Sequence, residues 1–154
     1  MLIVIAEKEE LKLVEELGYS NYPVLITGVG ALNVIDALED LPKDTEILNI
    51  GYCGSNFYDI GSKLQIRWVG THHTIAKFNE LSLGMKTLEF NNIDDITSCY
   101  TSTDFVTELS EIKDCVFDME LAFIRAIMPN TRAIKVVSDN LSHKQYKNKT
   151  KGEL

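Results

Sequence analysis

The sequence lacks the features of a secreted or membrane-spanning protein. Its 154 residues contain only three cysteines, an odd number, and no CxxC pair. Reduced thiols in a cytoplasmic protein are the simplest interpretation. No apolar run approaches the roughly 20 residues that a bilayer span needs. The start, MLIVIAEKEEL, lacks a basic region and turns acidic at once, so we expect a first core strand there and not a signal peptide.

Linkers, repeats, low-complexity blocks and dense basic patches are also missing. With 45% hydrophobic residues, the chain suits one compact domain over residues 1–154. The formal net charge of −8 and the pI of about 4.8 argue against nucleic acid or an anionic membrane as the main partner. His72, His73 and His143 do not pair with the cysteines at zinc-like spacing, so no metal or other cofactor is expected.

Continuous apolar runs predict strands buried on both faces. They occur in the segments LIVIA (Leu2–Ala6), PVLIT (Pro23–Thr27), DTEILNI (Asp44–Ile50) and AIKVV (Ala133–Val137). Helical patterns follow the first two, in EKEELKLVEELG with its natural stop at Gly18 and in ALNVIDALEDL, and DCVF is a short strand before a helix from about Met119 to Ile127. This alternation predicts an α/β fold: a single domain with a central, mostly parallel mixed sheet flanked by helices.

The middle of the chain has a less regular pattern. Residues 61–92 contain strand-like segments, KLQIRWVG and KTLEF, which suggest some antiparallel or mixed pairing. SCYTSTDFVTEL reads as a strand that leads into a turn and a short helix.

Carboxylates and glycines follow the predicted strands. In open α/β sheets, ligands bind beyond the carboxyl ends of the strands. The residues expected there are Glu7–Glu10, Gly28–Gly30, Gly51–Gly54, Ser102–Val106, Asp118–Glu120 and Ser138–Asp139. The sequence therefore predicts a pocket at this rim of the sheet.

Glu120 is the most unusual of these residues. On a helix it would share the apolar face of Phe117, Phe123, Ile124 and Ile127. A lone buried carboxylate is costly unless it has partners. Glu120 could bind backbone N–H groups at a helix start, but we favour pairing with the hydroxyls of a polar ligand.

Glu10 has the same inward direction, at the head of the stripe Leu13, Val14 and Leu17. A glutamate in the first turn can also complement the helix dipole. That simpler explanation fits Glu7 and Glu9 better than it fits Glu10.

Several rim residues permit two interpretations. Gly28 and Gly30 suit a tight turn as well as phosphate binding, and Gly51 and Gly54 suit a sharp turn or the close approach of a ligand. Asp139 could cap a following helix, with Ser138 as the competing cap, or act in a site. Phe105 could belong to the core or stack on a flat ring.

Taken in order, six segments resemble the nucleoside phosphorylase/nucleosidase family, and most closely its 5′-methylthioadenosine/S-adenosylhomocysteine nucleosidase branch. They are AEKEEL, TGVGALNV, NIGYCGS, STDFV, FDMELA and KVVSDN, and they extend from the N-terminus to Asn140. The middle, residues 61–92, aligns poorly. The chain is shorter than family members, so the resemblance implies a shortened member whose final helix is reduced or absent.

The resemblance implies hydrolysis of the N-glycosidic bond of a purine nucleoside. Asp139 would protonate the purine at N7, Glu10 would activate the attacking water, and Glu120 would hold the ribose hydroxyls. The remaining implied substrate-binding residues are Met119 against the ribose, Phe105 stacked on the purine, the Val106 backbone at the purine edge, Cys53 and Gly54 in the base pocket, and Ser138 and Lys135 in the KVVSDN segment.

The same resemblance favours water over phosphate as the nucleophile. Phosphate-using relatives place arginines in a GDPxR-like loop and just before the GxCG turn, and this chain has no such loop and has Asn49 at the second position. It departs from the nucleosidases at Tyr52, which replaces a small serine beside the water site, and at Lys135, which replaces an arginine. A phosphate-dependent purine nucleoside phosphorylase, a catalytically inactive nucleoside-binding relative, and a plain α/β domain whose carboxylates are caps are therefore the alternatives. The resemblance also implies a homo-oligomer, most simply a homodimer.

Overall fold

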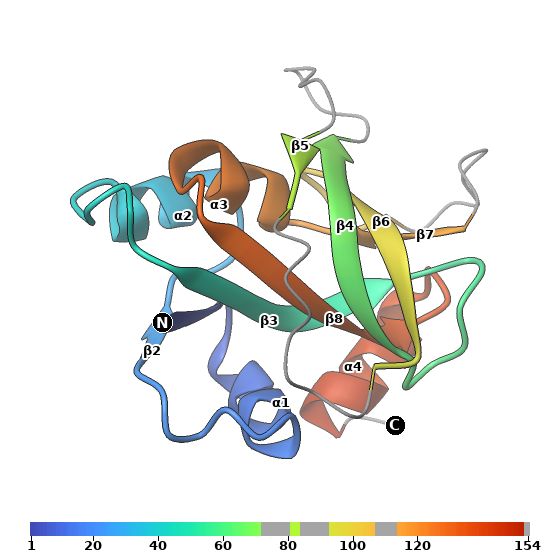
Figure 1. Ribbon diagram of the computed structural model, residues 1–154. Coiled ribbons are helices and arrows are strands. Elements are labelled where there is room, and N and C mark those ends of the chain that lie inside the picture. The colour runs from blue at the N-terminus through green and yellow to red at the C-terminus, as the bar shows by residue number, and fades with distance from the viewer. Residues whose placement is uncertain (72–80, 84–92, 107–113, 153–154) are drawn as a thin grey trace.

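The chain folds into a sheet with helices on both of its sides (Figure 1). The structure is a computed structural model, and it describes residues 1–71, 81–83, 93–106 and 114–152. In chain order its elements are β1 (Leu2–Ile5), the 3-10 helix η1 (Lys8–Glu10), α1 (Leu11–Glu16), β2 (Val24–Ile26), α2 (Ala31–Leu38), β3 (Ile47–Gly54), β4 (Lys63–Thr71), β5 (Leu81–Ser82), β6 (Asp95–Thr101), β7 (Cys115–Asp118), α3 (Leu121–Ile127), β8 (Thr131–Asp139) and α4 (His143–Lys151).

The predicted α/β fold with a mostly parallel mixed sheet is confirmed. The strands β1–β2, β1–β3, β3–β8, β4–β6 and β6–β7 pair in parallel, whereas β3–β7, β4–β5 and β4–β8 pair in the antiparallel sense. Two of the three antiparallel pairs, β4–β5 and β4–β8, involve β4 in the irregular middle of the chain, as its pattern suggested, whereas β3–β7 joins strands outside it. Because β8 pairs with both β3 and β4, the strands β3, β8, β4, β6 and β7 form a closed ring of pairings.

Alternation along the strands divides the core between the two sides of the sheet. Ile3 and Ile5 of β1 pack in one cluster with the stripe of α1, which consists of Leu13, Val14 and Leu17. Val4 points the other way, into a cluster with residues of α2 and α3, namely Val34, Leu38, Ile124 and Met128. In Figure 1, α2 and α3 accordingly lie on one side of the sheet, and α1 and α4 lie on the other.

Four expectations about the elements were wrong in detail. β3 continues through Gly51–Gly54, which the sequence placed in a turn after the strand. β8 likewise includes Ser138 and Asp139. β2 is an edge strand, and Ile26 is 46% exposed, so this strand is not buried on both faces. The helix expected from about Met119 begins at Leu121. Phe117 lies in β7 and is therefore not on the apolar face of that helix.

Several other expectations can be compared with the structure. Gly18 ends the first helix with a positive φ of 83°. A final helix is present after Asp139, in the form of the nine-residue α4. All three cysteines are buried thiols, and no helix in the described part of the chain is long and apolar enough to span a bilayer. The KTLEF segment, the His72–His73 pair and the short helix expected after Val106 lie outside the described residues.

Candidate active site

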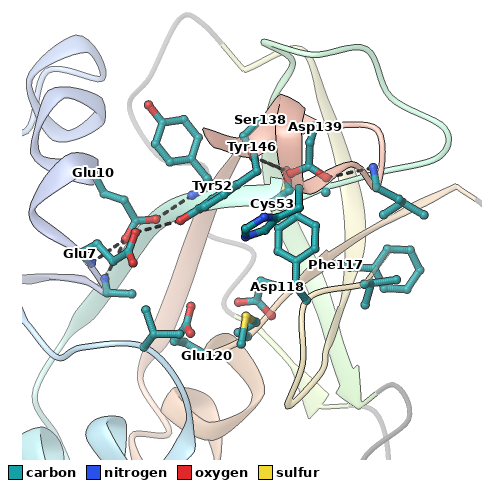
Figure 2. A pocket seen from close by; sticks show the side chains of 18 residues that line it. Glu7, Glu10, Tyr52, Cys53, Phe117, Asp118, Glu120, Ser138, Asp139 and Tyr146 are labelled. Atoms are coloured by element: carbon teal, nitrogen blue, oxygen red, sulfur yellow. Dashed lines mark hydrogen bonds between the residues drawn. The ribbon is translucent and has the colours of Figure 1, made fainter. Parts of the chain in front are cut away.

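A cavity of about 300 Å³ opens where the strands β1, β3, β7 and β8 end. This volume is at the lower limit for small-molecule sites. It is lined by Ala6, Glu7, Glu10, Val29, Tyr52, Cys53, Gly54, Phe105, Val106, Phe117, Asp118, Met119, Glu120, Ser138, Asp139, Leu141, His143 and Tyr146. Every site residue named from the sequence lies in this wall except Lys135, and Figure 2 shows the carboxylates distributed around the hollow.

Glu10 enters the cavity from the 3-10 helix after β1. Its Oε1 accepts hydrogen bonds from the backbone N–H of Ala6 at 2.8 Å and of Glu7 at 3.1 Å, and its Oε2 accepts one from the N–H of Tyr52 at 2.8 Å. Burial raises the pKa of this carboxyl, against the lowering effects of Lys135 and of these backbone donors. Glu10 is therefore held in one orientation by the main chain, in a dry environment.

The absence of a side chain at Gly51 allows two charged groups to approach β3. A Cβ atom there would lie 2.7 Å from Glu10 Oε2 and 3.1 Å from Lys135 Nζ. Any other residue would therefore displace the carboxylate, the ammonium group or the strand. This close packing, and not a turn, explains the first glycine of the GYCG segment.

Tyr52 directs its ring away from the cavity centre and toward α1. The ring belongs to the apolar cluster that contains Leu13, Val14 and Leu17, and Lys12 Nζ lies 5.8 Å from its centroid. In Figure 2 the Tyr52 hydroxyl points away from the carboxylates, while its backbone N–H meets Glu10. The Tyr52 side chain, which replaces the small serine of the nucleosidases, is therefore directed away from Glu10 (Figure 2).

Glu120 is the N-cap residue of α3, and its side chain reaches across to a different helix. Its Oε2 accepts a hydrogen bond from the N–H of Gly30 at 3.0 Å, and Gly30 is the N-cap residue of α2. Gly28 and Gly30 both have positive φ values, of 90° and 88°. The glycine turn thus binds this carboxylate, which favours the tight-turn interpretation over phosphate binding.

Burial, together with the nearby Asp118 carboxylate, raises the pKa of Glu120 to about 8. Glu120 is 9% exposed and has one hydrogen bond to protein in the described residues. A carboxylate has roughly four acceptor positions. Glu120 therefore has capacity for ligand hydroxyls, and donors placed there would favour its ionised form.

Asp118, which lines the cavity, forms a buried ion pair with Lys135. Lys135 Nζ lies 3.0 Å from Asp118 Oδ2, and both side chains are at most 2% exposed. Asp118 also accepts hydrogen bonds from Thr101 Oγ1 and from the N–H of Leu121. Burial alone would raise the pKa of Asp118 and lower that of Lys135, but their mutual attraction reverses both directions. Lys135 is thus paired below the cavity and does not line it.

Asp139 ends β8 at the opposite side of the cavity from Glu10 (Figure 2). Its Oδ1 accepts hydrogen bonds from the N–H groups of Leu141 at 2.9 Å and Ser142 at 3.2 Å, and its Oδ2 accepts one from Ser138 Oγ at 2.8 Å. Burial raises the pKa of Asp139, and these hydrogen bonds oppose the change. A Cβ at Gly54 would lie 2.9 Å from Asp139 Oδ1, so this glycine too makes room for a carboxyl.

Asp139 does not cap the following helix. The N-cap residue of α4 is Ser142, whose side chain accepts a hydrogen bond from the N–H of Gln145. Ser138, the other cap that the sequence offered, instead binds Asp139 and the carbonyl of Cys53. The capping interpretation of both residues was therefore wrong.

An aromatic group borders the cavity near α4. The ring of Phe105 lies 5.1 Å from that of His143 and 5.4 Å from that of Tyr146, in edge-to-face arrangements. Phe105 is half-buried and lines the cavity. It therefore retains ring surface for a flat ligand and is not enclosed in the core.

The sequence missed several residues of the wall. Asp118 was placed at the rim without a role, although a carboxylate beside a helix start is a signal of buried polar structure. Tyr146 and His143 were missed because α4 has a polar composition that resembles a solvated end. Phe117 was missed because it was assigned to a helix face. Among the described residues, no group of three or more His, Cys, Asp or Glu side chains is arranged to hold a metal ion.

Similarity to known proteins is found among solved structures. No family model matches the sequence, and no curated protein matches it. Solved structures do match. The MTAN of Chlamydia trachomatis bound to MTA superposes with a TM-score of 0.74 and 19% identity, over 97% of this chain and 89% of that one. A 5′-methylthioadenosine/S-adenosylhomocysteine nucleosidase from Neisseria meningitidis, in complex with methylthio-immucillin-A, gives a TM-score of 0.74 at 14% identity, over 97% and 91%.

A third structure gives a similar result. The S-adenosylhomocysteine nucleosidase of Streptococcus pyogenes, in complex with 5-methylthiotubericidin, has a TM-score of 0.73 and 15% identity, over 99% of this chain and 89% of that one. At such identities the likeness establishes the fold. The chain has the fold of these nucleosidases, so the resemblance to the nucleoside phosphorylase/nucleosidase family is confirmed at that level.

Proposed function

We propose that this protein hydrolyses the N-glycosidic bond of purine nucleosides related to 5′-methylthioadenosine and S-adenosylhomocysteine. The observation that carries the proposal is the meeting of three buried carboxyl groups, Glu10, Glu120 and Asp139, in one cavity at the ends of the strands. Each has different partners and so a different environment. Carboxyl groups in distinct environments can act separately as acid, as base and as a stabilising charge.

Glu120 would stabilise the ribose as its bond to the purine breaks. Departure of the base leaves positive, oxocarbenium-like charge on the sugar. The ribose hydroxyls would donate to the Glu120 acceptor positions that Gly30 leaves free, which favours the carboxylate form. A carboxylate in a dry site stabilises the developing charge more strongly than it would in water. Met119, which precedes it in the wall, would pack against the sugar.

Asp139 would protonate the purine at N7 and make it a better leaving group. Burial raises the pKa of Asp139 in the direction that retains a proton for transfer. The N–H groups of Leu141 and Ser142 both donate to Oδ1, whereas Oδ2 accepts from the Ser138 hydroxyl. Oδ2 is therefore the oxygen that can carry the proton. The purine ring would lie between Phe105 and the Cys53–Gly54 backbone, with its edge on the Val106 main chain.

Glu10 would take the proton from the attacking water. Its three backbone donors stabilise the ionised form, which offsets part of the desolvation. The buried ammonium of Lys135 adds a further favourable interaction with that charge. Lys135 therefore acts on the site from below, through Glu10 and Asp118, and we assign it a positioning role in place of direct contact with the substrate.

Water is favoured over phosphate by the charge of the wall. Within the described ranges, the cavity lining contains no arginine or lysine. A phosphate ion would therefore meet carboxylates without the cationic clamp that such an anion requires. The observation supports hydrolysis over phosphorolysis.

The proposal predicts that purified protein releases adenine from 5′-methylthioadenosine or adenosine at the same rate with and without added phosphate. The assay is chromatography of the products over time, with the sugar identified by mass as free or phosphorylated. Release that requires phosphate and yields a sugar phosphate would establish a phosphorylase instead. Ligand binding without any release would indicate a nucleoside-binding protein that has lost the chemistry. The homodimer and the cytoplasmic location remain predictions.

A further inference from the structure

Two polar residues of the cavity have no part in the mechanism above. Glu7 lies directly after β1, and Tyr146 lies in α4, yet both line the same cavity. The Tyr146 hydroxyl donates a hydrogen bond to Glu7 Oε2 at 2.8 Å. Lys151 Nζ lies 3.9 Å from the same oxygen. This pair joins two segments that are 139 residues apart, and it adds a carboxylate to the wall.

The position of the pair relative to the three catalytic carboxyls indicates what it meets. The Glu7 N–H binds Glu10 Oε1 at 3.1 Å, so Glu7 borders the proposed water site. In the view of Figure 2, Glu7 and Asp139 lie on opposite sides of the hollow, and the Tyr146 ring extends between them. The Glu7 side chain is 26% exposed, whereas Glu10 is only 7% exposed. Glu7 is thus on a more exposed side of the cavity than Glu10, across the hollow from Asp139 (Figure 2).

A nucleoside oriented by the proposed mechanism would present its 5′ substituent to this end. The purine is held at Asp139 and Phe105, and the 2′ and 3′ hydroxyls are held at Glu120. The part of the ribose that remains is the 5′ carbon with its substituent. Among the lining residues that the structure describes, the Glu7–Tyr146 pair is next to Glu10 on a more exposed side of the cavity, and we expect the 5′ substituent to meet it.

We propose that Glu7 and Tyr146 bind the 5′ substituent, and that they select purine nucleosides in which this substituent donates a hydrogen bond. A 5′ hydroxyl or a 5′ ammonium group meets this requirement, and a methylthio group does not. The inference rests on the proposed function of the same site. It narrows the substrate class of the proposed function: among these purine nucleosides, those with a hydrogen-bond donor at the 5′ position would bind more tightly than 5′-methylthioadenosine itself.

The chemistry of the pair supports this selection. The Tyr146 hydroxyl and the backbone N–H of Glu10 occupy two acceptor positions of the Glu7 carboxylate, which leaves about two for a ligand. A methylthio group placed there would remove water from the carboxylate and give it no hydrogen bond in return. A ligand donor would replace the lost water, and an ammonium group would also pair with the negative charge. The Tyr146 ring contacts Phe105, and the Tyr146 hydroxyl binds Glu7. Tyr146 therefore connects the residue proposed to stack on the purine with the carboxylate proposed to meet the 5′ substituent.

The test compares the affinities of four nucleosides that differ only at the 5′ position. They are adenosine, 5′-amino-5′-deoxyadenosine, 5′-deoxyadenosine and 5′-methylthioadenosine, and titration calorimetry measures their binding. The Asp139→Asn background is used so that the ligands stay intact. We expect the hydroxyl and amino compounds to bind about 10- to 100-fold more tightly than the methylthio compound, as a hydrogen bond to a charged group implies.

Glu7→Met should reduce this preference to about twofold or reverse it, because Met has similar length and no charge. Glu9→Met is the matched control. Glu9 belongs to the same segment and also lies near Lys151, at 3.6 Å, but it does not line the cavity. The control should keep the full preference.

Each outcome decides the inference. Tightest binding of the methylthio compound, or a preference that Glu7→Met leaves unchanged, overturns the role of Glu7 while leaving the nucleosidase intact. Failure of all four compounds to bind overturns both proposals. The expected preference together with an absence of adenine release by the unmodified protein would support the 5′ selection and reject the hydrolysis.

Discussion

Asp139→Asn is expected to slow adenine release by roughly 10²- to 10⁴-fold, the range for loss of a general acid. The asparagine keeps the shape of the side chain, and its oxygen can still accept from the N–H groups of Leu141 and Ser142. The fold and the nucleoside affinity should therefore remain close to those of the unmodified protein. Steady-state adenine release and calorimetric binding, measured side by side, separate the loss of chemistry from the loss of binding.

The pH profile provides a second readout of the same substitution. An acid must be protonated to act, so kcat/KM of the unmodified protein should fall as pH rises through the pKa of Asp139, which burial raises. This alkaline decline should disappear in Asp139→Asn. Asp114→Asn serves as the control, because Asp114 is exposed and does not line the cavity. An Asp139→Asn protein with full activity would exclude Asp139 as the acid.

Lys135→Met is expected to reduce the free energy of unfolding by about 3–5 kcal/mol. Removing one member of a buried ion pair leaves the other as an uncompensated charge, which is a costly change. Here the remaining charge would be Asp118, which is buried in the cavity wall just before α3. For a chain of this length, thermal unfolding should begin at least about 6 °C lower. Denaturant titration gives the free energy directly.

Two further variants isolate the cause. Lys135→Met combined with Asp118→Asn should recover much of the loss, because the amide oxygen can still accept from the Leu121 N–H and the amide NH2 can donate to the Thr101 hydroxyl oxygen. Lys151→Met removes an ammonium of a partly exposed pair and should cost about 1 kcal/mol or less. If Lys135→Met were as mild as Lys151→Met, the buried pair would have no special weight in the fold.

The sequence predicted the architecture because burial on both faces leaves a clear pattern. The apolar runs at β1 and β8 and the helical stripe of α1 were found where the structure has them. Strand limits were less accurate: Gly51 and Gly54 were expected after the strand, in a sharp turn or at a ligand, and they lie within β3. These two glycines allow the side chains of Glu10, Lys135 and Asp139 to approach the strand closely. Contacts between distant segments of this kind have no local signal.

The residues of the candidate site were likewise predicted only in part from the sequence. Glu10 and Glu120 were identifiable because a carboxylate within an apolar pattern is unexpected, although Glu120 precedes α3 as its N-cap residue and is not on the helix face to which the sequence assigned it. Asp118 was not identified as a charge partner, because its partner Lys135 is on another strand. Glu7 was assigned to the helix dipole, and its bond to Tyr146 becomes visible only when α4 packs against the 3-10 helix after β1. The 5′ end of the site therefore required the structure.

The central claim is that the cavity stabilises positive charge on a ribose ring, and ligand affinity tests it most directly. The measurement compares an adenosine analogue whose sugar ring carries a protonated nitrogen with its neutral isostere. It uses the unmodified protein and Glu120→Gln, which keeps a hydrogen-bonding side chain and removes the charge. The account predicts that the cation binds at least about 100-fold more tightly to the unmodified protein. It also predicts that Glu120→Gln reduces this ratio to about tenfold or less. Equal affinities of the two analogues, or a ratio that Glu120→Gln leaves unchanged, would contradict the claim.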